Sequence, residues 1–341
     1  MIVARSETDP WGAAAIERRN MSVSARKTSL AQMPEVYDAL RPICDLLLSP
    51  GELNFDQHER KLWMLAINML VAEGQHDVAK ARIGALRNHF PPSQTLDNLA
   101  MTLSRMPEAV DDAAFAGFRD DLTAEVQVIP RAGASTVLLG FGGARGKMGI
   151  PINLLHRWFG EAGVHVIYLR DMTAKLFMRG LGSIAPDYPQ TIAALRKTID
   201  DLGAERIVCQ GNSGGGFGAL RLGLDLGAER ILVFGAQSHP FLNTDKRTFF
   251  LLRRFGVEEA MDLRPLYESA ENPPKVRMVY AADHDIDALQ AKNMDGLPGV
   301  TLEPMLNDGN HGVFVPLLES GRYDELLREL VTGEPAPPIA R

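Results

Sequence analysis

The sequence predicts an α/β protein, in which a mostly parallel sheet with helices on both faces follows an all-helical N-terminal region. Over residues 121–335, short apolar runs alternate with helix-like segments, which is typical of parallel strands covered on both faces. Over residues 28–120, apolar residues instead recur at helical spacing. The length of 341 residues and the 45% hydrophobic content fit one large soluble domain with a smaller one before it.

Seven apolar runs are predicted as strands. They cover residues 125–130, 136–139, 164–169, 206–209, 231–234, 276–280 and 300–305. Helices are predicted over residues 153–162, 192–202, 217–224 and 288–293. In a parallel sheet of this kind, a functional site is expected beyond the carboxyl ends of the strands.

The region before the sheet is predicted in two parts. Residues 1–27 are polar and mixed, and are expected to form a loose arm. In the helical region, Trp63, Ala79 and Pro91 resemble the pattern of one tetratricopeptide repeat, although Ile67 and Leu70 replace its usual glycine and tyrosine. One helix pair cannot bury its own apolar face. We expect these helices to pack on the α/β domain, or alternatively to bind a protein partner or a second copy of the chain.

Composition excludes several classes of function. The formal net charge of -7 argues against a nucleic-acid-binding protein. No apolar run reaches the roughly 18 residues needed to cross a bilayer, and the first ten residues lack the apolar core of a signal peptide. A cytoplasmic location without membrane insertion is therefore expected. Cys44 and Cys209 are predicted to be buried free thiols, no metal-binding cysteine spacing exists, and no cofactor is expected.

The most informative motif is Gly211-Asn212-Ser213-Gly214-Gly215, which lies between a predicted strand and a predicted helix. A serine on so sharp a turn is strained, and flanking glycines relieve the crowding. Its hydroxyl then projects above the sheet, next to the Gly214 N–H at the start of the helix. The motif therefore predicts Ser213 as a nucleophile and Gly214 as a donor to an oxyanion.

Two other interpretations of this turn are a phosphate-binding loop and a purely structural turn. A dinucleotide site needs an acidic residue at the end of the next strand. Here strand 231–234 is followed by Gly235-Ala236-Gln237-Ser238, without an acid, and no lysine stands where a P-loop would need one. The phosphate-binding interpretation is therefore disfavoured.

A serine nucleophile needs a histidine base that a third group holds in place. His311 lies in Asn310-His311-Gly312, in a glycine-rich loop after the last predicted strand, and is predicted as the base rather than a surface histidine. Three aspartates follow strand 276–280. Asp283 is the preferred acid because it lies nearest the strand end, whereas Asp285 and Asp287 would serve if the loop were one turn longer.

With these residues in the order Ser…Asp…His, residues 125–332 resemble the α/β-hydrolase family. The resemblance implies a serine nucleophile, a histidine base and an orienting acid. It also implies a second oxyanion donor from the loop after strand 136–139.

That loop begins Gly140-Phe141-Gly142-Gly143, and Leu139 stands where many members of the family have a histidine. By position the Phe141 N–H is predicted as the second oxyanion donor, with Gly142 next. The alternative is that this glycine run is a flexible surface turn.

Basic residues gather after the same strand ends and predict a positively charged pocket that would take an anionic substrate. They are Arg145, Lys147, Arg170, Lys175 and Arg179, against the single acid Asp171. The alternative is a solvated face with a local Arg170–Asp171 pair. His239 is also predicted to line the pocket, and residues 249–255 are predicted to form either a small lid helix or an ordinary packed helix.

The expected function is hydrolysis of a carboxylic ester, a thioester or an amide in a small-molecule or acylated substrate, through a Ser-His-Asp triad and an acyl-enzyme. An acyltransferase would use the same triad to pass the acyl group to a hydroxyl or an amine. A third interpretation is a non-catalytic binding module with a hydrolase-like fold.

Overall fold

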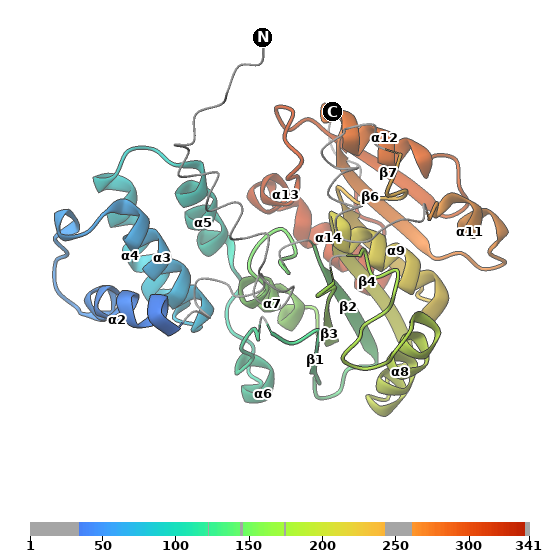
Figure 1. The fold of residues 1–341 in the computed structure, drawn as a ribbon, viewed down its shortest axis with the longest axis horizontal. Helices are drawn as coiled ribbons and strands as arrows, with labels where there is room; N and C mark the ends of the chain where they lie inside the picture. Colours follow the sequence, from blue (N-terminus) through green and yellow to red (C-terminus); the bar gives the residue numbers. More distant parts are fainter. Residues whose placement is uncertain (1–33, 122, 144–145, 174, 243–260, 338–341) are drawn as a thin grey trace, which may run out of the picture.

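One mixed sheet organises the chain in the computed structural model, which describes residues 34–337 apart from residues 122, 144–145, 174 and 243–260 (Figure 1). The strand order is β1-β3-β2-β4-β5-β6-β7. The strands are β1 (Val126–Ile129), β2 (Thr136–Gly142), β3 (His165–Arg170), β4 (Arg206–Asn212), β5 (Arg230–Phe234), β6 (Lys275–Ala281) and β7 (Val300–Met305). Only β1 runs antiparallel to its neighbour, so the predicted mostly parallel sheet is confirmed.

Successive side chains of each strand enter two hydrophobic cores, one on each face of the sheet. In β2, for example, Val137 and Leu139 belong to one core and Leu138 to the other, as the alternation of a strand requires. Helices cover both faces (Figure 1). Those of the first core are α8 (Tyr188–Asp201), α9 (Gly214–Leu226), α11 (Arg264–Ser269) and α12 (Asp285–Asn293), and those of the second are α7 (Ile152–Glu161), α13 (Phe314–Ser320) and α14 (Arg322–Thr332).

The N-terminal helices share the second core with the sheet. They are α2 (Pro34–Leu48), η3 (Phe55–Gln57), α3 (Arg60–Ala72), α4 (His76–His89), α5 (Gln94–Arg105) and α6 (Ala113–Ala116). Helix α3 contacts α7, and α5 contacts α13, where Arg105 donates a hydrogen bond to the carbonyl of Glu319. Because buried residues from both regions form one cluster, the helices pack on the α/β part of the chain.

Trp63 and Ala79 are fully buried, and the Trp63 indole N–H donates to the carbonyl of Phe55. The tetratricopeptide interpretation and the domain boundaries at residues 28, 121 and 335 remain predictions. The predicted arm over residues 1–27 and the predicted helix over residues 249–255 lie outside the described residues. None of the helices in the described part of the chain is long and apolar enough to span a membrane.

Both cysteine thiols are buried and free. Burial raises the pKa of Cys44 to about 11 and raises the pKa of Cys209 further still. Both thiols are therefore protonated at neutral pH.

Candidate active site

The turn between β4 and α9 consists of a single residue, Ser213. Its φ of 54° and ψ of -122° lie in a region that non-glycine residues rarely occupy. A Cβ atom on Gly211 would lie 2.5 Å from the carbonyl oxygen of Gly215, and one on Gly215 would lie 2.3 Å from that of Phe141. The glycines around Ser213 therefore permit a turn that any side chain would block.

A continuous chain of hydrogen bonds starts at the Ser213 hydroxyl. Its Oγ lies 2.9 Å from Nε2 of His311, and Nδ1 of His311 lies 2.7 Å from Oδ1 of Asp287. The carboxylate accepts the Nδ1 proton, which leaves the Nε2 lone pair to accept the proton of the serine. Asp287 is 2% exposed and His311 is 43% exposed, so the acid is buried while the base faces outward.

The structure corrects the choice of acid, because it places Asp287 rather than Asp283 against His311. Asp283 accepts hydrogen bonds from the backbone N–H groups of Asn307, at 3.0 Å, and Gly309, at 2.9 Å. The hydrogen bond from Gly309 is the main reason why the pKa of Asp283 is lowered. Asp283 thus ties the end of β6 to the loop that leads to His311.

Helix α12 explains the difference between the aspartates. It begins at Asp285, which is exposed, and its third residue, Asp287, turns toward the end of the sheet and is buried. The side chain of His284 accepts a hydrogen bond from the Asp287 N–H and so caps the helix. The cap fixes the first turn of the helix, and with it the direction of Asp287.

Two residues of this site were not predicted from the sequence, Gly235 and His284. Gly235 follows β5 with a φ of 51°, and a Cβ atom there would lie 2.9 Å from Cε1 of His311 and 3.2 Å from Oδ2 of Asp287. A glycine directly after the strand beside the serine turn was the available signal. The Nδ1 atom of His284 lies 3.1 Å from Oδ1 of Asp287.

His284, Asp287 and His311 also bring three potential metal-ligand atoms within 4.8 Å of one another. Two of these residues already bind each other in the chain that starts at Ser213. In the part of the chain that the structure describes, this is the group with metal-ligand geometry, and it belongs to the serine site.

Gly214 is the first residue of α9, so its N–H has no acceptor one turn earlier within the helix. Gly214 directly follows Ser213, and its role as an oxyanion donor remains a prediction. The side chain of Leu176 lies close to Gly214, so that a Cβ atom on Gly214 would be 3.0 Å from it. Leu176 itself has a φ of 55°.

The predicted second donor, Phe141, is a buried residue within β2 rather than part of a loop. It is paired with Leu169 of β3 and Gly211 of β4. Phe141 therefore belongs to the sheet and not to the predicted loop, and its role as an oxyanion donor remains a prediction. The next choice, Gly142, ends the strand, and the N–H of Gly143 donates to the carbonyl of Lys147.

The structure also corrects the prediction that Arg170 contributes charge to a pocket. The Arg170 side chain is 2% exposed and forms an ion pair with Asp120. It also donates to the carbonyl of Ala124 and to the side chain of Gln127. The alternative Arg170–Asp171 pair does not form either, because the Asp171 carboxylate accepts backbone N–H groups of its own loop.

The other pocket residues predicted from the sequence have different outcomes. Arg145 lies outside the described residues. Lys175 is half-buried in the loop after β3, where its backbone N–H donates to Asp171. His239 is half-buried, and the side chain of Gln290 in α12 bonds to its backbone N–H and carbonyl. Roles for Lys175 and His239 in substrate binding remain predictions.

The pKa of His311 predicts how activity depends on pH. The hydrogen bond to Asp287 raises this pKa above 6.5, against the opposing effect of burial. The imidazole accepts a proton only when neutral, so kcat/KM for p-nitrophenyl acetate is expected to rise with pH through a pKa above 6.5. Asp287→Asn should move this limb to lower pH. A wild-type limb centred at or below 6.5 would contradict the assignment.

The stability of the folded chain should depend on pH in the opposite direction to activity. Because folding raises the pKa of His311, the charged pair with Asp287 stabilises the folded chain fully below pH 6.5. That contribution is lost as the pH rises through the raised pKa. The neutral form of His311, which is the form that acts as the base, therefore lacks this stabilisation.

The sheet order and the serine turn give the chain an α/β-hydrolase-like fold. No protein-family model matches the sequence, and no curated protein matches it. Among solved structures, it is similar to an α/β-hydrolase enzyme from the metagenome of lagoon sediments of Mar Chica, Morocco, at 13% identity and a TM-score of 0.40, covering 62% of this chain and 96% of that one.

It is also similar to an S-formylglutathione hydrolase from Agrobacterium tumefaciens, at 14% identity and a TM-score of 0.41, covering 61% of this chain and 88% of that one. A third similar structure is the capsule O-acetyltransferase of Neisseria meningitidis serogroup A, at 12% identity and a TM-score of 0.41, covering 60% of this chain and 91% of that one. Likeness at this level transfers no activity to this chain.

Proposed function

We propose that this protein is a serine hydrolase that cleaves a carboxylic ester through an acyl-enzyme. The observation that carries the proposal is the hydrogen-bond chain from Ser213 through His311 to Asp287, which starts on a strained turn at the end of a central strand. Strain at a non-glycine residue persists only where the surrounding structure holds it in place, and such residues gather at active sites.

In the first half of the reaction, Ser213 Oγ attacks the carbonyl carbon of the ester while Nε2 of His311 takes its proton. The buried Asp287 carboxylate stabilises the imidazolium through the Nδ1–H group. The Gly214 N–H donates to the oxygen that becomes negative. When the tetrahedral intermediate collapses, the C–O bond to the leaving group breaks, and His311 returns the proton to that alcohol.

In the second half, a water molecule replaces the alcohol. His311 removes one of its protons as the water oxygen attacks the acyl carbon. The bond from the acyl carbon to Ser213 Oγ then breaks, and the serine regains its proton from His311. Esters are favoured over amides on one ground, that an alkoxide needs less assistance to leave than an amine. Thioesters and amides remain tests of this preference.

A fluorophosphonate probe tests the proposal, because it reacts with an activated serine. The wild-type protein should be labelled at Ser213, as read by mass spectrometry of its peptides, and Ser213→Ala should not be labelled. Ser183→Ala, which removes an exposed hydroxyl elsewhere, is the control and should be labelled like the wild type. Labelling that persists in Ser213→Ala, or a wild-type protein that does not react, would contradict the proposal.

A further inference from the structure

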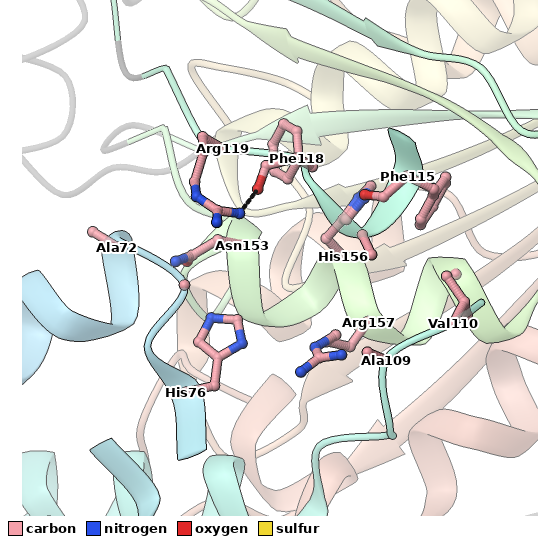
Figure 2. A pocket seen from close by; sticks show the side chains of 13 residues that line it. Ala72, His76, Ala109, Val110, Phe115, Phe118, Arg119, Asn153, His156 and Arg157 are labelled. Atoms are coloured by element: carbon pink, nitrogen blue, oxygen red, sulfur yellow. Dashed lines mark hydrogen bonds between the residues drawn. The ribbon is translucent and has the colours of Figure 1, made fainter. Parts of the chain in front are cut away.

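A cavity of about 140 Å³ lies where the N-terminal helices meet the α/β part of the chain, shown in Figure 2. Three segments form it: the turn between α3 and α4, residues 109–119 with helix α6, and helix α7. Its lining residues with polar side chains are His76, Arg119, Asn153, His156 and Arg157, and the others are small or apolar. No carboxylate lines the cavity among the described residues.

The two arginines bring positive charge, and no acidic residue in the described ranges forms an ion pair with either of them. Arg157 is half-buried and forms no hydrogen bond or ion pair with any residue in the described ranges. Arg119 is exposed, and among the described residues its guanidinium donates only to the carbonyl oxygens of Phe118, at 2.8 Å, and Gly117, at 3.4 Å. Figure 2 shows the two arginines on different parts of the cavity wall, Arg119 in the segment after α6 and Arg157 on α7.

The two histidines of the cavity add no charge of their own at neutral pH. His156 uses both ring nitrogens, one with the Tyr168 hydroxyl at 2.7 Å and one with the Phe115 carbonyl at 2.9 Å, and burial lowers its pKa to about 4. Burial, and then the charge of Arg157, lower the pKa of His76 to about 4 as well. The charge that a ligand would meet is therefore that of the arginines.

We propose that this cavity binds a small oxyanion, a phosphate or carboxylate group, between Arg119 and Arg157. A guanidinium presents paired N–H donors in a plane, which match two oxygens of such a group. The volume is similar to the roughly 150 Å³ of a cavity that admits benzene, so a phosphate or an acetate fits. A bound oxyanion would link α7 to the segments from the N-terminal helices. This role would not depend on hydrolysis at Ser213.

Isothermal titration of the full-length protein with sodium phosphate, at low ionic strength and neutral pH, tests the site. The wild type should show saturable binding, and Arg157→Gln should bind at least about tenfold more weakly, because a charge-assisted hydrogen bond is lost. Lys80→Gln removes one positive charge from the exposed side of α4, outside the cavity, and should bind like the wild type. Sodium acetate in parallel distinguishes a carboxylate from a phosphate site.

Arg119→Gln provides a second variant if Arg157→Gln proves unfolded by circular dichroism. Absence of saturable binding of both anions to the wild type would overturn the proposal, and so would equal binding by the wild type and both arginine variants. Ser213→Ala should bind phosphate like the wild type, because the cavity and the serine site share no residue. The result is thus independent of whether the protein is a hydrolase.

Discussion

Asp287→Asn is expected to lower kcat for ester hydrolysis by about 10⁴-fold with little change in the fold. The carboxylate accepts the Nδ1 proton of His311 at 2.7 Å and thereby leaves Nε2 free to act as the base. An asparagine at this position can instead donate its amide to Nδ1, which favours the tautomer that carries the proton on Nε2. That tautomer cannot take the proton of Ser213. Steady-state hydrolysis of p-nitrophenyl acetate measures the loss.

The neighbouring aspartates provide the matched controls for Asp287. Asp285→Asn makes the same change two residues earlier in the same helix, at an exposed position, and should leave kcat close to the wild-type value. Asp283→Asn weakens the bonds to the backbone of the His311 loop and should reduce activity much less than Asp287→Asn. If Asp283→Asn proves the more damaging of the two, the assignment of the acid is wrong.

Gly235→Ala is expected to lower kcat/KM by about 100-fold, because a displacement of roughly 1 Å at a reacting group has an effect of that size. The new methyl group would lie 2.9 Å from Cε1 of His311, which is closer than real Cβ contacts, and 3.2 Å from Oδ2 of Asp287, which is a tight contact. The imidazole must then move away from Ser213. Activity and thermal unfolding should be measured on the same preparation.

Gly227→Ala separates this contact from the backbone strain that accompanies it. Gly227 ends α9 with a φ of 70°, and a Cβ atom there would meet nothing within 4 Å. Both variants should lose about 1–2 kcal/mol of stability from the left-handed conformation. Only Gly235→Ala should also lose activity. Comparable activity in the two variants would show that Gly235 does not hold His311 in place.

The strands, the serine turn and His311 could be predicted from the sequence because each has a local signal. Alternating apolar runs indicate strands, and glycines on both sides of Ser213 indicate a tight turn. The acid had no such signal. The choice between Asp283 and Asp287 depends on whether a helix begins at Asp285. His284 caps that helix, and histidine is a residue type that seldom caps helices.

Arg170 shows a second limit of sequence reasoning. Arg170 is the last residue of β3, so it does lie at the edge of the sheet where functional sites are expected. Its partner, Asp120, lies 50 residues earlier in the chain, and Gln127 belongs to the antiparallel strand β1. A pairing over such a distance depends on the packing of β1 against β3, which no local pattern shows. A basic residue at a strand end can therefore be neutralised by a distant carboxylate.

The shared core of the N-terminal helices and the sheet has a consequence for synthesis on the ribosome. Helix α5 is made early, but its contact with α13 joins Arg105 to Glu319, 214 residues later. At roughly 5–20 residues per second, translation of that interval takes roughly 10–40 s. During this time the emerging helices expose the apolar side chains that α7 and α13 later cover. The nascent chain is thus most prone to aggregation, and most in need of a chaperone, before its last two helices leave the ribosome.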